Sequence, residues 1–193
     1  MMHAAILLVA GRSSRMGSLK GLIEWQGKLL VVHQIEQLLK SKIEQMIVVL
    51  GYQSEVYQPI ISELGSSVTI VWNENWEQGK SSSILKGITA LPKDCRSILF
   101  VNIDQPLQFS VVNQLIDSFE QTKSPIHLPI FHGKRGHPLL ISCELLPALS
   151  TINEEEQGLK KIIRAYQKDI RSVEVDDPHI LYNFNTPKDM KGE

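Results

Sequence analysis

Short apolar runs of strand length recur along this chain, and helical patterns separate them. Most of the runs are continuous rather than alternating, which is typical of strands covered on both faces. Between the first two, Val31, Ile35, Leu38 and Leu39 fall at helical spacing. The runs span residues 4–10, 46–50, 68–72, 98–101, 126–130 and 138–141. This repeated order of strand and helix predicts an α/β fold with a mostly parallel sheet wrapped by helices.

Further helical patterns fill the later part of the chain. Apolar residues at 84, 85, 88 and 91, and again at 112, 115, 116 and 119, fit two helices, and Ser110 is placed to cap the second. A last helix is expected from about Gly158 to Gln167. Between these helices the rhythm changes, because two apolar segments flank the polar turn HGKRG at 132–136. That pattern predicts an antiparallel hairpin, an added edge strand or a long loop.

Length and composition favour one globular domain over residues 1–193. The chain is 42% hydrophobic and 21% charged with a net charge of -1, so no basic excess indicates a nucleic-acid partner. No stretch approaches the roughly 18 apolar residues of a membrane span, and the N-terminus lacks signal-peptide features, so a cytoplasmic location is expected. Cys95 and Cys143 lie far apart in the sequence and are expected to be reduced thiols rather than zinc ligands.

The stretch LLVAGRSSRMGSLKG, residues 7–21, begins as a strand and continues as a glycine-rich, hydroxyl-rich and cationic loop. Glycines let backbone N–H groups approach an anion closely, and the cations supply opposite charge. The spacing matches neither the Walker pattern nor G-x-G-x-x-G. On spacing alone, a phosphate-binding loop and a solvated surface turn are equally good interpretations. The residues of interest in the loop are Gly11, Arg12, Ser13, Ser14, Arg15, Gly17 and Lys20.

The segment VNIDQPL places one carboxylate, that of Asp104, at the end of an apolar strand. Ligands of open parallel sheets bind at the carboxyl ends of the strands, so this loop and the first loop are expected at the same edge. A single carboxylate can hold Mg²⁺ when substrate phosphates and waters supply the other ligands. The alternative is a turn cap, but the nearby polyphosphate loop favours the metal interpretation.

Two further segments carry polar groups for binding. In NENWEQGKSSSI, Gly79, Lys80 and three serines begin a helix whose free N–H groups could bind an anion or a base carbonyl. In GKRGHP, residues 133–138, two cations, two glycines and His137 suit contact with a second, anionic substrate, although a basic hairpin tip fits equally well. His132 and His137 lie near no acidic or cysteine partner in the sequence, so a zinc site is not expected.

Taken in order, five segments resemble one family. LLVAGRSSRMGSLK, NENWEQGKSSSILKGI, VNIDQPL, GKRGHPLLI and NFNTPKDM are similar to the MobA-like nucleotidyltransferases, and most similar to their molybdenum cofactor cytidylyltransferase branch. The resemblance implies a Rossmann-like, three-layer α/β/α domain of the nucleotide-diphospho-sugar transferase type. It also implies an enzyme that uses Mg²⁺ and an NTP, expected to be CTP, to place a nucleoside monophosphate on molybdopterin or a related phosphorylated acceptor, with release of pyrophosphate.

The resemblance also assigns roles to residues of this sequence. In-line attack by an acceptor phosphate on the α-phosphorus needs positioning and charge neutralisation rather than a protein nucleophile. The implied catalytic residues are Arg15, Lys20 and Asp104, and the implied metal ligands are Asp104 and Asn185. The implied nucleotide-binding residues are Ala10, Gly11, Arg12, Ser13, Ser14, Gly17, Asn73, Gly79, Ser81 and Ser82. The implied acceptor-binding residues are Gln105, Arg135, Gly136 and His137.

The sequence departs from the cytidylyltransferase pattern at three places. NFNTP has Asn183 and Asn185 where that branch has D-x-D-T-P, and it resembles the N-x-N-T-P of the guanylyltransferase branch. Lys160 stands where a Gly-x-Arg motif has arginine, and LVAG replaces LAAG. Guanylyl transfer, transfer to a sugar or polyol phosphate, and a non-catalytic protein that escorts cofactor therefore stay open as alternatives. The expected partners are the NTP, the acceptor, and a molybdoenzyme or its chaperone.

Overall fold

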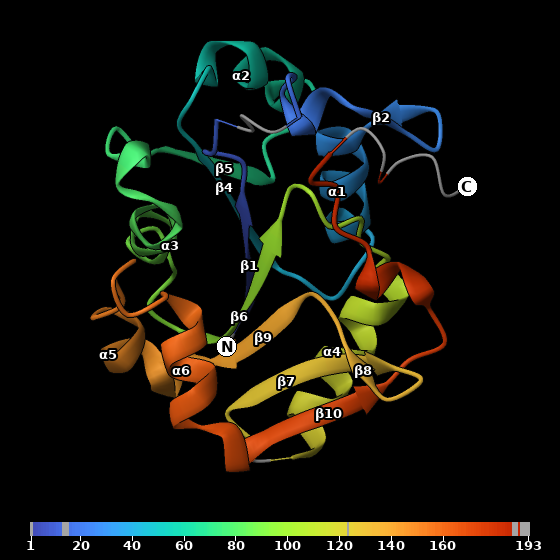
Figure 1. The fold of residues 1–193 in the computed structure, drawn as a ribbon, viewed down its shortest axis with the longest axis vertical. Helices are drawn as coiled ribbons and strands as arrows, with labels where there is room; N and C mark the ends of the chain where they lie inside the picture. Colours follow the sequence, from blue (N-terminus) through green and yellow to red (C-terminus); the bar gives the residue numbers. More distant parts are fainter. Residues whose placement is uncertain (1, 13–15, 123, 187–188, 190–193) are drawn as a thin grey trace.

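A computed structural model describes residues 2–12, 16–122, 124–186 and 189 of the chain. Its centre is a sheet in the order β10-β7-β9-β6-β1-β4-β5, with β8 paired to β7 (Figure 1). The strands are β1 (Met2–Leu8), β4 (Gln45–Leu50), β5 (Val68–Trp72), β6 (Cys95–Asn102), β7 (Ile126–Phe131), β8 (Lys134–Arg135), β9 (Leu139–Ser142) and β10 (Ile170–Glu174). A separate small hairpin joins β2 (Glu24–Trp25) to β3 (Lys28–Leu29).

Most neighbouring strands run parallel, as the sequence predicts. β5, β4, β1 and β6 form one parallel set, and β7 pairs in parallel with β10. The turn at 132–136 does form an antiparallel hairpin, in which Ile130 lies opposite Arg135. The fully buried strand β9 runs antiparallel between β6 and β7, so the reversed strand lies inside the sheet and not at its edge.

Helices cover both faces of the sheet and bury two cores, which gives the expected three layers. Alternate residues of β1 point to opposite faces. Ala5 and Leu7 pack with α1 (Leu30–Leu39), α2 (Ser54–Ser62) and α4 (Phe109–Gln121). Ile6 and Leu8 pack on the other face with α3 (Lys80–Ile88), α5 (Leu146–Leu149) and α6 (Leu159–Ala165) (Figure 1).

Some local expectations are wrong in detail. Ser110 does not cap α4, because the helix already begins at Phe109 and its N-cap is Gln108. α6 ends at Ala165 rather than at about residue 167, where a short 3-10 turn leads into β10. The sequence does not predict α2. This helix buries only Tyr57 and Ile61 and contains Pro59, so its apolar pattern is weak and a helix-breaking residue interrupts it. No helix within the described ranges combines the length and apolar character needed to cross a bilayer.

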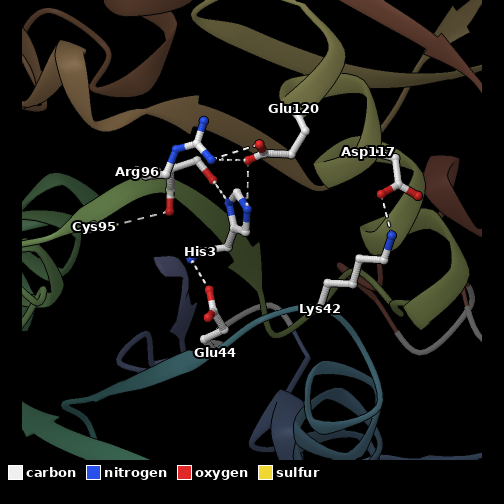
Figure 2. Close-up of polar contacts among 8 residues, drawn as sticks. His3, Lys42, Glu44, Cys95, Arg96, Asp117 and Glu120 are labelled. Carbon is white, nitrogen blue, oxygen red and sulfur yellow. Dashed lines mark hydrogen bonds and ion pairs between the residues drawn. The ribbon is translucent and has the colours of Figure 1, made fainter. Parts of the chain in front are cut away.

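A polar network closes the amino end of the sheet, opposite the strand ends where ligands are expected (Figure 2). The ring of His3 contacts Ser97 Oγ at 2.8 Å and Glu120 Oε1 at 3.1 Å, and Arg96 donates to Glu120 at 2.8 Å. Burial lowers the pKa of His3 below its usual 6.5, although Glu120 opposes this shift. Because these groups satisfy one another, they stabilise the join between β1, β6 and α4.

The two cysteines are close in space. Cys95 and Cys143 are free thiols whose Sγ atoms are hydrogen bonded at 2.9 Å. They are 48 positions apart in the sequence, and the antiparallel pairing of β6 with β9 brings them together. Sequence spacing alone could not show this proximity.

Candidate active site

A cavity of about 460 Å³ opens at the carboxyl ends of β1 and β6. The two loops that the sequence predicts at one edge of the sheet do meet there, together with residues before and at the start of α3 and a segment near the C-terminus. The lining residues are Leu8, Ala10, Gly11, Arg12, Lys20, Trp76, Glu77, Gly79, Lys80, Ser83, Asn102, Ile103, Asp104, Gln105 and Asn183. Its volume lies in the usual range for a small-molecule site.

An ion pair at this cavity joins Lys20 to Asp104. Lys20 Nζ lies 2.6 Å from Asp104 Oδ2 and 3.2 Å from Asn185 Oδ1. The two side chains of the ion pair are only 11% and 21% exposed, so water screens them less than it screens surface pairs. The pair joins the end of the first loop, the end of β6 and the NFNTP segment, which are far apart in the sequence.

Buried contacts hold the C-terminal segment beside Asp104. The backbone N–H of Phe184 donates to the carbonyl of Asp104 at 2.8 Å. The Phe184 side chain is 1% exposed and packs on Trp25, with ring centroids 5.0 Å apart. This anchor positions Asn183 at the cavity and Asn185 against Lys20.

Gln34 of α1 holds the loop that carries Asp104, and sequence reasoning missed it. Its side-chain amide donates to the carbonyls of Asn102 at 3.1 Å and Gln105 at 2.7 Å, and its Oε1 accepts from the N–H of Leu107 at 2.9 Å. Gln34 is fully buried, so these bonds satisfy a polar group that would otherwise be costly. A polar residue at helical spacing from Val31 and Leu38 was the available signal.

The predicted nucleotide-binding residues near the start of α3 do not all line the main cavity. Asn73 Nδ2 donates to Ser82 Oγ at 2.8 Å and to Ser83 Oγ at 3.0 Å, so Asn73 and Ser82 bind each other. Gly79 lines the cavity with a φ of 99°, which favours glycine. Ser81 lines a neighbouring cavity instead.

The first loop is only partly described. Ser13, Ser14 and Arg15 lie outside the described residues. Ala10, Gly11 and Arg12 line the cavity, and the Arg12 guanidinium lies 5.8 Å from the centre of the Tyr52 ring. Gly17 has a φ of 69°, and a Cβ on Gly11 or Gly17 would meet nothing within 4 Å. The backbone of both glycines is therefore open to close approach.

The predicted acceptor-binding residues are not all at the cavity. Gln105 is buried, accepts from Asn102 Nδ2 at 2.5 Å, and shares a small cleft with His137. Burial and the charge of Lys80 lower the pKa of His137, while Asp104 opposes them. Arg135 is exposed on β8, and Gly136 packs so closely that an added Cβ would lie 2.4 Å from the carbonyl oxygen of Ile180.

Lys80 lines the cavity, although the sequence predicts only a helix start at this position and assigns its side chain no role of its own. It is the first residue of α3 and lines both the main cavity and its neighbour. The Lys80 side chain is exposed as a whole, but desolvation of its ammonium lowers the pKa, and the carboxylates of Asp104 and Glu154 oppose this shift. The signal in the sequence was a cation directly after Gly79 at a helix start.

The donors at the site suit a hard divalent cation. Within the described ranges, no three histidine, cysteine, aspartate or glutamate side chains gather as a metal cluster. The carboxylate of Asp104 and the amide oxygen of Asn185 nevertheless turn toward one positive centre, Lys20 Nζ. One carboxylate with a neutral oxygen fits an ion such as Mg²⁺, which takes its other ligands from phosphate and water.

Comparison with known proteins identifies the family of the chain. Residues 5–170 match the family model of the MobA-like NTP transferase domain. The chain belongs to this family. As a member it is a nucleotidyltransferase with the α/β Rossmann-like fold that the sequence predicts.

Three relatives that are similar to the chain over most of its length carry different names. The molybdenum cofactor cytidylyltransferase of Escherichia coli is 25% identical over 186 residues, covering 96% of this chain and 92% of that protein. A probable molybdenum cofactor guanylyltransferase of Thermococcus sibiricus is 27% identical and covers 96% and 94%. The nicotine blue oxidoreductase of Paenarthrobacter nicotinovorans is 28% identical over 172 residues and covers 82% and 80%.

Solved structures share the fold. A nucleotidyl transferase from Methanothermobacter has a TM-score of 0.81 at 22% identity, covering 98% of this chain and 94% of that one. Rv0371c of Mycobacterium tuberculosis, in complex with manganese, has a TM-score of 0.80 at 18% identity and covers 98% and 96%. At these identities the likeness establishes the architecture.

Proposed function

We propose that the chain transfers a nucleoside monophosphate, CMP from CTP, to molybdopterin or a related phosphorylated acceptor. The partly buried Lys20–Asp104 pair at the cavity is the observation that carries this proposal. An oxygen of the acceptor phosphate attacks the α-phosphorus of the NTP and forms the new P–O bond. The bond from the α-phosphorus to the bridging oxygen breaks, and pyrophosphate leaves with that electron pair.

The chain's own groups bind and orient the triphosphate. The Lys20 ammonium and the Arg12 guanidinium at the cavity attract the phosphate oxygens, and the open backbone at Gly11 allows N–H groups to approach them. Arg15 is proposed to add a third cation. These positive charges stabilise the negative charge that develops on the α-phosphate and on the departing pyrophosphate. The attacking phosphate is already ionised, so the site needs no strong general base.

Asp104 and Asn185 are the residues that would hold Mg²⁺. When bound, the ion supplies charge neutralisation on the triphosphate. The manganese complex of a protein with the same fold supports a divalent metal in such an architecture. In the chain itself, Asp104 fixes the position of the Lys20 ammonium at 2.6 Å, so this carboxylate orients a cation at the cavity.

Guanylyl transfer is the second candidate, and one segment favours it. Asn183 at the cavity and Asn185 beside Lys20 belong to NFNTP, which resembles the guanylyltransferase pattern. The cytidylyltransferase and guanylyltransferase relatives are 25% and 27% identical to the chain, so overall similarity favours neither base. In either case we infer a cytoplasmic enzyme that passes its product to a molybdoenzyme or its chaperone.

Pyrophosphate release from CTP, GTP and ATP, each with Mg²⁺ and molybdopterin, tests the proposal. Release with CTP alone is the expected result, and a preference for GTP would select the second candidate. A wild-type protein that binds NTP but releases no pyrophosphate with any of them would contradict nucleotidyl transfer to this acceptor. It would then favour the non-catalytic, cofactor-escorting role.

A further inference from the structure

A second cavity of about 350 Å³ adjoins the first and has no part in the nucleotide chemistry above. It lies between the start of α3 and the segment that leads into α6, and the two cavities share Lys80. Its lining residues are Lys80, Ser81, Ile84, Glu154, Gln157, Gly158, Leu159 and Lys160. A ligand at the shared lysine could therefore extend away from the nucleotide into this second space.

One polar group in the second cavity has no partner among the described residues. Ser81 is 3% exposed, and its Oγ makes no hydrogen bond with the part of the chain that the structure describes. A buried hydroxyl without a partner costs free energy, which a bound acceptor atom would recover. Gly158 faces this hydroxyl, and an added Cβ there would lie 2.8 Å from Ser81 Oγ. The glycine therefore keeps space free beside the serine.

The charges around the second cavity favour an anion. Lys80 and Lys160 line it with a single carboxylate, that of Glu154. Glu154 Oε1 already accepts the N–H of Ser81 at 2.5 Å, so this carboxylate serves the first turn of α3. Two cations and one engaged carboxylate leave a local excess of positive charge. Ile84 and Leu159 add apolar wall, which suits the body of an organic ligand.

We propose that the second cavity binds the body of the acceptor, and that this acceptor carries a second anionic group besides the phosphate that reacts. Lys160 and Ser81 hold the second anionic group, and Lys80 positions the reacting phosphate at the junction of the two cavities. The substrate class is therefore a small organic phosphate with another negative charge and an apolar edge. This inference rests on the proposed nucleotidyl transfer at the first cavity.

Inorganic phosphate is the first probe, because its binding does not depend on knowing the acceptor. The full chain is first saturated with a non-hydrolysable analogue of CTP, or of GTP if only that one binds. Calorimetry then measures the binding of inorganic phosphate. Lys160→Gln is expected to weaken phosphate binding about 10- to 100-fold, the range for loss of a charge-assisted hydrogen bond, with analogue affinity unchanged. Lys86→Gln, an exposed lysine in the last turn of α3 that does not line the second cavity, is the control and keeps wild-type phosphate binding.

Ser81→Ala separates binding from folding. The alanine removes an unpartnered buried hydroxyl, so its Tm should equal or exceed that of the wild type while phosphate binding weakens. Equal phosphate affinity in the wild type, Lys160→Gln and Ser81→Ala would overturn the inference, as would an equal loss of analogue binding in Lys160→Gln.

A kinetic measurement then tests the acceptor directly. With molybdopterin, Lys160→Gln is expected to raise the acceptor KM about 10-fold or more while the NTP KM stays unchanged. An unchanged acceptor KM contradicts the second cavity but leaves nucleotidyl transfer intact. The failure of nucleotidyl transfer gives a different result, which is wild-type protein that releases no pyrophosphate from any NTP.

Discussion

Replacing Asp104 by asparagine separates the charge of this side chain from its shape. Asparagine keeps the volume and one oxygen, but it removes the negative charge 2.6 Å from Lys20 Nζ. The pair is partly buried, so we expect unfolding to become easier by about 1–2 kcal/mol. For a chain of this size, that corresponds to a Tm lower by roughly 2–8 °C.

The same substitution should have a much larger effect on turnover. Loss of a group that organises transition-state charge typically lowers the rate about 10²- to 10³-fold. NTP binding should be retained or tighter, because the Lys20 ammonium is no longer neutralised by a carboxylate. Pyrophosphate release measures the rate, and calorimetry with a non-hydrolysable analogue measures binding.

A second lysine–aspartate pair provides the matched control. Asp117 of α4 pairs with Lys42 on the surface, where both side chains are about half exposed (Figure 2). Asp117→Asn should cost less than about 1 kcal/mol and leave turnover unchanged. A rate of Asp104→Asn within about threefold of wild type would show that Asp104 has a structural role only.

Three further outcomes follow from particular contacts. Gly136→Ala should lower the Tm, because the new Cβ would lie 2.4 Å from the carbonyl oxygen of Ile180. The expected loss in the free energy of unfolding is about 1–3 kcal/mol. An unchanged Tm in a thermal scan would contradict this close packing. Burial lowers the pKa of His127 below 6.5, so the unfolded state binds more protons than the folded state as the pH falls through 6.5. Urea unfolding should therefore show the full free energy of unfolding above pH 6.5 and a smaller one below it. This loss should be smaller in His127→Gln. Mild oxidation with diamide should join the Cys95 and Cys143 thiols with loss of two hydrogens by mass spectrometry, whereas alkylation of both thiols after treatment would show that they do not pair.

The sequence by itself determined the layered α/β architecture and the edge of the sheet where chemistry is expected. Continuous apolar runs predict strands buried on both faces, and apolar residues at helical spacing predict the helices that cover them. Both patterns involve residues close together in the sequence, so the sequence alone is enough to find them. The sequence alone therefore places the loop after β1 and Asp104 after β6 at one edge of the sheet. The motif order also predicted the family, which the match over residues 5–170 confirms.

Only the tertiary structure decided which of these residues meet. Asp104 lies 84 positions and Asn185 lies 165 positions after Lys20 in the sequence. Their contact with Lys20 depends on the buried side chain of Phe184 and on Gln34, which holds the loop that carries Asp104. The reversed β9 inside the sheet and the second cavity beside Lys80 likewise arise from long-range packing. Local patterns fix what each segment can become, whereas side-chain distances arise from how all segments bury their apolar surface together.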